Sequence, residues 1–307
     1  MILTVTLNTA LDITYSVPAL TPHSSHRVGE VAERPGGKGL NVARVLSALG
    51  HESVVTGFAG GPAGAVLRDL LAPLPPRDAL VPIAGTTRRT IAVVDSGTGD
   101  TTQLNEPGPT VTAEEWAAFV AAYGTLLRDA AAVALCGSLP RGIQVGAYGD
   151  LIRMARAAGV PVLLDTSGEP LRRGIAARPD LIKPNADELA LLTGAREPRR
   201  ATRDARRRGA HAVVASLGPD GLLALTPDGG WRAAPPERVR GNPTGAGDSA
   251  VAALLSGLVE GLSWPDRLAR AVALSAATVL APAAGEFDRA AYETLLPRVT
   301  VTEHPAA

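Results

Sequence analysis

The chain contains a single cysteine, Cys136, among its 307 residues. One cysteine excludes a disulfide within the chain, and it excludes a metal site built from several thiolates. The five histidines lack metal-ligand spacing, so we expect no zinc site. Sparse cysteine is consistent with a reducing cytosol, and we therefore expect a cytoplasmic protein.

Net charge is absent as well, because 30 basic residues balance 30 acidic ones. A neutral chain has no general attraction for nucleic acid or an anionic membrane, so we expect neither as a partner. No apolar run reaches membrane-spanning length, and residues 1–7 carry no basic leader. With 46% apolar residues, the chain has enough for a large core, as one large domain or as a core plus a small appendage.

The chain also has very few lysines. Of the 30 basic residues only Lys38 and Lys183 are lysines, which leaves 28 arginines. A compact ammonium fits where a planar guanidinium does not, so the two lysines indicate functional positions. The alternative is that these two lysines remain by chance in an arginine-rich chain. Both lie inside motifs described below, which favours a functional role.

The most informative stretch is residues 241–249, GNPTGAGDS, which precedes an apolar run over residues 250–262. The helical spacing of that run places the glycines at the N-terminus of a buried helix that ends near Gly261. Free backbone amides and the helix dipole then form a site for an anion such as phosphate. Asp248 lies in the first turn, where a general base for a hydroxyl would act.

Two other interpretations of this stretch remain open. A carboxylate in the first turn of a helix also stabilises the helix through its dipole, without any catalytic role. The segment GAGDSA further fits a loose dinucleotide-binding fingerprint. That motif requires an apolar strand directly before the first glycine, whereas residues 238–243 read RVRGNP, so this interpretation is disfavoured.

A second glycine-rich stretch covers residues 35–46, PGGKGLNVARVL. Its glycines open a helix whose apolar residues recur at helical spacing and which ends at Gly50. The pattern predicts a second amide-lined anion pocket, with Lys38 on it and Asn41 one turn into the helix. It is no Walker A loop, because the lysine spacing is wrong and no Ser or Thr follows. A simple packing turn would explain the first two glycines but not the following KGLN.

Helical and strand-like patterns alternate from Thr112 onward, which is typical of βαβ units on a parallel sheet. We expect helices at 113–129, 144–158, 186–193 and 199–208, and strands at 2–7, 54–58, 132–136, 160–165, 181–183 and 212–216. Several strands end in polar loops, which should converge with Asp248 at one edge of the sheet. Asp12, after the first strand, is either a ligand of sugar hydroxyls or a turn residue. We expect a frayed tail after Val301.

Two segments, about 13–34 and 86–105, predict short strands without partner helices. They would form a small sheet beside the main domain, as a lid or a dimer surface. Arg88 and Arg89 lie on it, where a planar guanidinium suits a phosphate, although a solvated basic edge is the alternative. Asn185 and Glu188 share a helical face at i and i+3, where they would order Mg²⁺ through water.

The two glycine motifs, GGKGLNVAR at 36–44 and TGAGDS at 244–249, resemble the signatures of the ribokinase-like (PfkB) carbohydrate kinases. The segment KPNxxE at 183–188 lies between them, and the similarity runs essentially end to end. The chain most resembles the hexose-phosphate branch, the 1-phosphofructokinases and tagatose-6-phosphate kinases. This resemblance implies a single αβα kinase domain over residues 1–307, a mostly parallel sheet and a discontinuous β lid.

The resemblance also implies roles for individual residues. Asp248 would be the catalytic base, with the amides of Gly245, Ala246 and Gly247 as the anion hole. Nucleotide and metal contacts are implied for Lys183, Asn185, Glu188, Ser216, Gly218 and Gly221. Sugar-phosphate contacts are implied for Asp12, Arg27, Gly37, Lys38, Asn41, Arg88 and Ser138. Arg27 corresponds to a lid arginine that in relatives reaches a neighbouring subunit, which implies a homodimer through the lids.

The implied activity is ATP- and Mg²⁺-dependent phosphorylation of a ketohexose phosphate, with fructose 1-phosphate to fructose 1,6-bisphosphate ranked first. Tagatose 6-phosphate and fructose 6-phosphate are the alternative substrates, and a non-catalytic sugar-phosphate sensor is a further alternative. Three departures from the family pattern bear on the substrate: Thr9 where proline is frequent, Thr90 where asparagine is usual, and the sequence Ala283-Ala284-Gly285 after the last long helix.

Overall fold

The computed structural model describes residues 1–303, which form one large sheet, flanking helices and a smaller second sheet. The large sheet has the strand order β15-β14-β13-β12-β11-β10-β9-β1-β4-β5. Every neighbouring pair from β5 to β12 is parallel, as is the pairing of β6 with β4. These strands are β1 (Ile2–Thr6), β4 (Ser53–Gly60), β5 (Arg77–Asp78), β6 (Val81–Ile83), β9 (Ala132–Cys136), β10 (Val162–Asp165), β11 (Leu181–Ile182) and β12 (Ala212–Ser216). The predicted, mostly parallel sheet is thereby confirmed.

One edge of the large sheet is antiparallel, which the sequence pattern did not reveal. It consists of β13 (Leu222–Thr226), β14 (Gly229–Ala234) and β15 (Thr300–Glu303), each antiparallel to its neighbour. The prediction of a frayed tail is wrong for Thr302 and Glu303, because β15 pairs with β14. The rest of the predicted tail lies outside the described residues.

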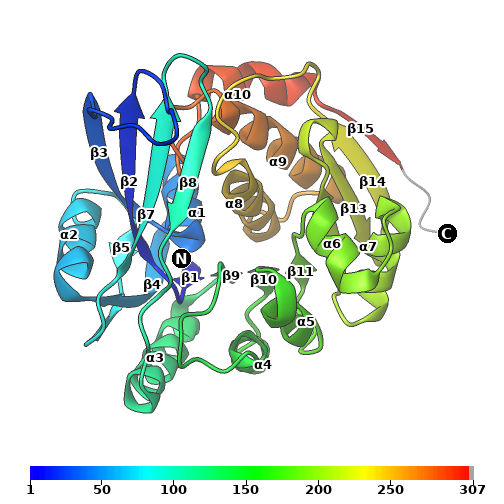
Figure 1. The fold of residues 1–307 in the computed structure, drawn as a ribbon. Coiled ribbons are helices and arrows are strands. Elements are labelled where there is room, and N and C mark those ends of the chain that lie inside the picture. Colours follow the sequence, from blue (N-terminus) through cyan, green and yellow to red (C-terminus); the bar gives the residue numbers. More distant parts are fainter. Residues whose placement is uncertain (304–307) are drawn as a thin grey trace.

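Helices cover both faces of the large sheet, and together they give the predicted αβα layering (Figure 1). One layer holds α1 (Lys38–Ala48), α2 (Gly61–Leu71), α8 (Ala246–Val259) and α9 (Trp264–Val279), and α10 (Arg289–Leu295) packs on α9. The other holds α3 (Ala113–Leu126), α4 (Ala147–Ala157), α5 (Gly168–Ile175), α6 (Ala186–Thr193) and α7 (Pro198–Arg207). Three short 3-10 helices are η1 (Leu127–Asp129), η2 (Gly218–Asp220) and η3 (Leu296–Arg298).

Alternation along the buried strands explains the two layers. Ile2 packs in the core cluster that contains residues of α1, α8 and α9, whereas Leu3 packs in the cluster that contains residues of α3, α4 and α5. Successive side chains of a strand point to opposite faces, so a strand that is buried at every position, as β1 is, needs helices on both sides. The central strand therefore fixes the middle layer between two helical layers.

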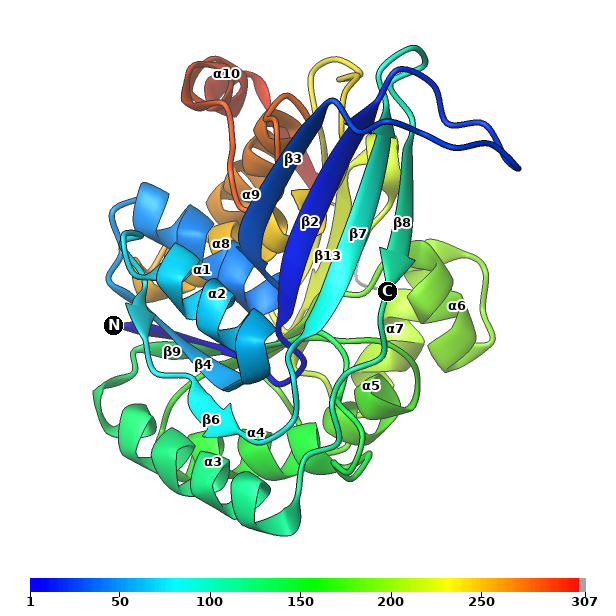
Figure 2. The ribbon, with the colours of Figure 1, turned by 60° about the vertical axis from the view of Figure 1, so that its left-hand side comes forward.

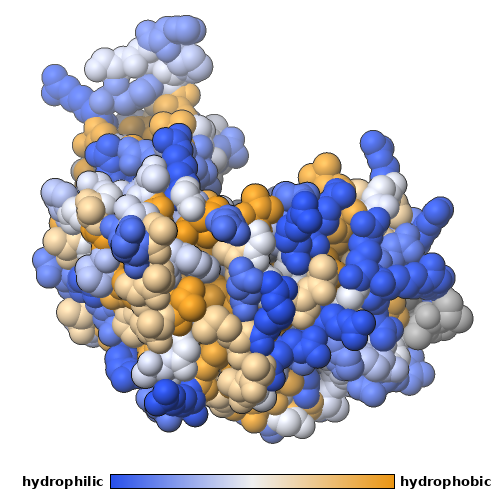
Figure 3. Space-filling view, turned by 90° about the horizontal axis from the view of Figure 1, so that it is seen from below, coloured by the Kyte–Doolittle hydropathy of each residue, from blue (hydrophilic) through white to orange (hydrophobic). Residues whose placement is uncertain are grey.

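The helices differ in their outer surfaces. Seen from below, the side of the molecule that carries α6 and α7 is strongly hydrophilic (Figure 3). Arg200 and Arg207 on α7 contribute to this surface, with side chains 77% and 72% exposed. Across residues 1–303, no helix has both the length and the apolar content needed to cross a membrane.

The smaller sheet stands beside the main domain in the order β3-β2-β7-β8 and forms the lid (Figure 2). Its strands are β2 (Ala10–Val17), β3 (Glu30–Gly36), β7 (Arg88–Asp95) and β8 (Thr101–Asn105). The predicted segment 86–105 forms β7 and β8, which pair antiparallel, while β2 and β7 pair parallel. Asp12 lies within β2 rather than in a turn, because β2 begins at Ala10 and extends β1 almost directly into the lid.

Candidate active site

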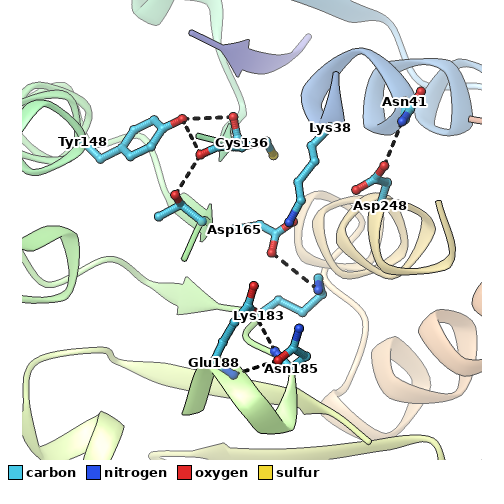
Figure 4. Close-up of polar contacts among 11 residues, drawn as sticks. Lys38, Asn41, Cys136, Tyr148, Asp165, Lys183, Asn185, Glu188 and Asp248 are labelled. Carbon is cyan, nitrogen blue, oxygen red and sulfur yellow. Dashed lines mark hydrogen bonds and ion pairs between the residues drawn. The ribbon is translucent and has the colours of Figure 1, made fainter. Parts of the chain in front are cut away.

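The predicted site residues come from the carboxyl ends of the central strands, from two helix N-termini and from the base of the lid. In an open α/β sheet, ligands bind at the carboxyl ends of the parallel strands, where the helix N-termini also meet. Helices α1 and α8 pack against each other, so their two glycine-rich starts lie together. Figure 4 shows the side chains that converge there.

The start of α8 requires glycine. Gly245 is the residue before the helix, with φ of +86°, and a Cβ there would lie 2.8 Å from Ala284. Only glycine adopts this backbone without strain and without that collision. The N–H of Ala246 donates to the carbonyl of Pro243 at 3.2 Å, whereas within residues 1–303 the N–H of Gly247 has no acceptor. The N–H of Gly245 likewise has no acceptor within the described residues, so the amides of Gly245 and Gly247 are free donors of the predicted anion hole, and that of Ala246 is engaged in the turn.

Asp248 lies in the first turn of α8 and is buried, with 7% of its surface exposed. Its Oδ2 accepts a hydrogen bond from Nδ2 of Asn41 on α1, at 2.9 Å. Burial raises the pKa of Asp248 to about 6, the nearby Asp165 adds to this, and the ammonium of Lys38 opposes it. A carboxylate that titrates near neutral pH is suited to accept a proton from a hydroxyl.

Both lysines of the chain contact one carboxylate, that of Asp165 at the end of β10. Nζ of Lys38 lies 3.1 Å from Oδ2 of Asp165, and Nζ of Lys183 lies 3.5 Å from Oδ1 (Figure 4). The sequence analysis placed Asp165 at the end of the expected strand 160–165 and gave it no role. The structure shows a buried carboxylate that joins Lys38 of the motif at 36–44 to Lys183 of the motif at 183–188.

The sugar side of the site is formed by the base of the lid. Asp12 on β2 lies directly against Gly36, where a Cβ would collide with its carboxylate. Burial raises the pKa of Asp12 to about 6, while a hydrogen bond from Thr90 and the charge of Arg88 lower it. Gly37 has φ of +111° and is the residue before α1. Asp12, Gly37, Lys38 and Asn41 therefore share one region between lid and core.

Arg88 and Ser138 meet through a residue that the sequence analysis did not assign to the site. Nε of Arg88 donates to the backbone carbonyl of Asn8 at 3.3 Å, and Nδ2 of Asn8 donates to Oγ of Ser138 at 3.0 Å. The two predicted phosphate ligands are thus linked by Asn8, which follows β1. The only feature of the sequence that could have assigned Asn8 to the site was its position directly after the first expected strand.

Arg27 is the predicted residue that the structure does not bring into this protomer's site. It is exposed and lies in the connection between β2 and β3. That connection projects beyond the tip of the lid (Figure 2). Arg27 lies at the opposite end of the lid from Arg88, so its predicted contact with the sugar phosphate stays a prediction that requires a neighbouring subunit.

A cleft of about 1070 Å³ opens beside the start of α8 and contains most of the predicted nucleotide residues. Ser216, Gly218 and Gly221 line one wall, and Ala246 and Gly247 line the end nearest Asp248. The opposite wall comes from α9, through Val272, Ser275, Ala276 and Val279, which the sequence analysis did not assign. The volume is at the upper end of the range for small-molecule pockets and accommodates a nucleoside triphosphate.

Asn185 also lines this cleft, and Asn185 and Glu188 form a capping box at the start of α6. Oδ1 of Asn185 accepts from the N–H of Glu188 at 2.8 Å, and Oε2 of Glu188 accepts from the N–H of Asn185 at 2.9 Å. Each side chain keeps one polar atom outside this box. Residues 1–303 contain no cluster of three or more His, Cys, Asp or Glu that would hold a metal directly.

Comparisons with known proteins agree with this geometry. The family model described as pfkB family carbohydrate kinase matches residues 5–290. The chain is 38% identical over 289 residues to the 1-phosphofructokinase of Rhodobacter capsulatus, covering 92% of both chains. Its fold matches phosphofructokinase-2 from Escherichia coli in its tetrameric inhibited form, with a TM-score of 0.89, 28% identity and coverage of 97% of this chain and 98% of that one.

A third match fixes the class of fold. Arabidopsis thaliana ribokinase complexed with ribose and ATP superposes with a TM-score of 0.73 at 21% identity, covering 96% of this chain and 98% of that one. The αβα core with its separate β lid is therefore a ribokinase-like fold, as predicted. The chain belongs to the pfkB family of carbohydrate kinases. It is an ATP-dependent sugar kinase, and the predicted kinase class is confirmed.

Proposed function

We propose that the chain transfers the γ-phosphoryl group of ATP to a primary hydroxyl of a ketohexose phosphate, with fructose 1-phosphate as the preferred acceptor. The product is fructose 1,6-bisphosphate. The relative from Rhodobacter capsulatus, a 1-phosphofructokinase at 38% identity, supports this choice. Tagatose 6-phosphate and fructose 6-phosphate are the competing acceptors. Phosphofructokinase-2 from Escherichia coli has been solved in complex with fructose-6-phosphate, at 28% identity and a TM-score of 0.88.

One observation carries the proposal. The buried carboxylate of Asp248, held by Asn41, lies at a helix start whose Gly247 amide is free and lines a nucleotide-sized cleft. On its α1 side, Asp248 faces the region between lid and core that contains Asp12, Lys38 and Asn41. An alcohol on that side and a terminal phosphate in the cleft would face each other across the start of α8, which is the arrangement an in-line transfer requires.

Each residue then has a chemical task. Asp12 and Asn41 bind hydroxyls of the sugar, and Asp248 accepts the proton of the attacking hydroxyl. The free amide of Gly247 and the ammonium groups of Lys38 and Lys183 stabilise negative charge on the transferring group. Ser216, Gly218 and Gly221 bind the nucleoside part of ATP. Because proton removal is late in such transfers, positioning and charge neutralisation supply most of the rate.

Magnesium fits the mouth of the cleft. Oε1 of Glu188 lies outside the capping box, and Oδ1 of Asn185 keeps a second lone pair beyond its bond to the Glu188 amide. Both oxygens are able to accept hydrogen bonds from the water that Mg²⁺ retains when proteins bind it. We therefore assign these two residues to the metal through water. The ion would neutralise charge on the nucleotide phosphates.

The sugar phosphate is assigned to Arg88, Ser138 and Lys38, with Arg27 supplied by a second protomer. Fructofuranose has near two-fold symmetry between its C1 and C6 hydroxymethyl groups. A clamp of this kind would therefore accept a 1-phosphate and present O6, or the reverse. The product is the same bisphosphate in either case.

We assign the dimer interface to the outer face of the lid. Asp12 and Thr90 are paired in the lid sheet and face the site, so the next paired row, with Ile13, Ile91 and Leu104, lies on the other face. The row of Val31 and Tyr15 extends this apolar face, on which Val31 is 56% and Leu104 58% exposed. A second copy would cover both residues and place its lid tip near the first site.

A coupled assay of ADP release tests the function. Fructose 1-phosphate, fructose 6-phosphate, tagatose 6-phosphate, ribose and adenosine are compared with MgATP at equal concentrations. We expect the highest kcat/KM for fructose 1-phosphate. Turnover only with unphosphorylated sugars or nucleosides would refute the phosphate assignment, and no turnover with any of them would favour a sugar-phosphate sensor.

A further inference from the structure

The two lysines of this chain share a single buried counter-ion. Asp165 ends β10, is 1% exposed, and pairs with Lys38 at 3.1 Å and Lys183 at 3.5 Å (Figure 4). β10 lies between β9 and β11 in the parallel part of the sheet, and its register with both is continuous. The carboxylate is therefore held at the end of a strand that is paired on both sides within the parallel sheet.

The two ammonium groups lie on either side of the transfer path. Lys38 is the first residue of α1, with a side chain 41% exposed, and it lies close enough to Asp248 to affect its ionisation. Lys183 follows β11, and its Nζ lies 3.4 Å from where a Cβ on Gly247 would stand. One cation thus belongs to the sugar side and the other to the amide that lines the nucleotide cleft.

Two ammonium groups in one small region repel each other, and each is at the end of a flexible four-carbon stem. A carboxylate between them removes the repulsion and restrains both stems. Burial raises the pKa of Asp165, but Lys183 and Lys38 lower it further, so the net pKa is below its ordinary value. Burial lowers the pKa of Lys38, yet the charges of Asp165 and Asp248 raise it overall. Asp165 and Lys38 are therefore both charged at neutral pH.

The geometry also explains the residue type. The chain uses arginine at 28 of its 30 basic positions, yet both partners of Asp165 are lysines. Each oxygen of Asp165 meets one nitrogen from a different element, which suits a compact ammonium. A guanidinium prefers to bind both carboxylate oxygens with its planar fork, and would exclude the second cation.

We propose that Asp165 is a positioning residue for phosphoryl transfer, which holds Lys38 against the acceptor side and Lys183 against the α8 amides. This inference rests on the proposed function, because it gives both lysines a task in the transfer. It assigns Asp165 no contact with substrate. An alternative is that the three charges form an ion cluster that serves folding alone.

The test compares Asp165→Asn, Lys38→Met, the double variant Lys38→Met/Lys183→Met and the triple variant that adds Asp165→Asn to it, using the substrate on which the wild type is most active. We expect kcat of Asp165→Asn to fall about 10- to 100-fold, the scale of a group misplaced by about 1 Å. KM for the sugar phosphate should rise as well, because Lys38 is assigned to that phosphate, whereas KM for ATP should change much less. The triple variant should lose little beyond Lys38→Met/Lys183→Met, because Asp165 acts only through the two lysines. Tyr148→Phe is the matched control, since it removes buried hydrogen bonds to the carbonyls of Cys136 and Gly137, both at 3.0 Å, at the neighbouring strand end.

The pH dependence of kcat gives a second readout that a purely structural role would not move. The charged and titratable groups around Asp248 are Lys38 on α1, Asp165 on β10, Lys183 after β11 and the buried thiol of Cys136 on β9. The acidic limb is the fall of kcat at low pH, where Asp248 becomes protonated. Removing the negative charge of Asp165 should lower the pKa of Asp248 and move this limb to lower pH. Removing the positive charge of Lys38 should move it to higher pH. Tyr148→Phe should lower the melting temperature and leave the limb in place.

Two outcomes would overturn the proposal. One is an Asp165→Asn enzyme with kcat within about twofold of wild type and an unmoved acidic limb. The other is a triple variant, Asp165→Asn with both lysines changed to Met, at least tenfold slower than Lys38→Met/Lys183→Met. This comparison also serves if the single Asp165→Asn variant does not fold, because the triple variant leaves neither lysine ammonium without its counter-ion. A wild type that phosphorylates a different sugar would refute the proposed acceptor, whereas the comparison among variants would stand.

Discussion

Replacing Asp248 with asparagine should stabilise the protein while it removes the catalytic base. Burial raises the pKa of Asp248 from 3.8 to about 6, so the folded state binds a proton more tightly there than the unfolded chain does. The carboxylate therefore destabilises the fold wherever it is ionised, and the penalty grows as pH rises from about 4 to about 6. Asparagine carries no charge at any pH, and its amide oxygen is able to accept the hydrogen bond from Asn41.

The magnitude follows from the pKa difference. At about 1.4 kcal/mol per pKa unit, ionised Asp248 costs at most about 3 kcal/mol at pH 7.5. At pH 5 the folded-state carboxyl is mostly protonated, and the cost is about half as large. We therefore expect Asp248→Asn to raise the free energy of unfolding by about 1–3 kcal/mol at pH 7.5 and by less at pH 5. Its kcat should fall about 10²- to 10⁴-fold, the usual loss for a general base.

Urea unfolding of both proteins at pH 5 and pH 7.5 measures this difference directly. Glu237→Gln is a matched control, because it also removes one carboxylate, but from an exposed ion pair with Arg298 at 3.2 Å. Such surface pairs contribute little, so the control should change by less than about 1 kcal/mol at both pH values. If Asp248→Asn were no more stable than wild type at pH 7.5, the pKa would not be raised by burial. If it retained near-native kcat, Asp248 would not be the base.

Three further predictions concern the reaction and the assembly. The wild-type kcat should fall as pH drops through about 6, because the base must be deprotonated, and a flat kcat between pH 5 and 8 would contradict this. Arg88→Ala should raise KM for the sugar phosphate about 10- to 100-fold, the value of one charge-assisted hydrogen bond, with KM for ATP unchanged; equal increases for both substrates would place Arg88 outside the phosphate site. Val31→Asp combined with Leu104→Asp should convert a dimer to a monomer, as measured by the molar mass in light scattering. If the double variant kept the molar mass of the wild-type dimer, the lid face would not be the interface.

The sequence predicted those parts of the site that depend on local backbone chemistry. Glycine at 245, an anion-binding amide at 247 and a carboxylate at 248 are specified by a short stretch that only one local conformation satisfies. Strands β9 and β12 and helix α6 begin and end where the periodicity indicated. The roles of the individual site residues in binding and transfer remain predictions that the experiments above address.

Other elements escaped prediction for identifiable reasons. Helix α5 has the sequence GEPLRRGI, whose glycines and proline are poor helix formers, and it forms because Leu171 and Ile175 pack into the core. β13, the first strand of the β13–β14 hairpin, has the short apolar sequence LLALT. The spacing of apolar residues in so short a run does not distinguish a strand from a buried helix. The capping box of Asn185 and Glu188 was overlooked because the same spacing suits a metal site.

The amino-acid sequence alone therefore determined the fold class, the two glycine-led helix starts and the chemistry that phosphate binding requires, because these depend on residues close together in the chain. Only the tertiary structure decided that Lys38 and Lys183, 145 positions apart, meet the same carboxylate, and that Arg27 lies away from the site of its own protomer. Contacts of this kind are set by strand order and by the path of the lid. Neither leaves a periodic or compositional trace in the sequence.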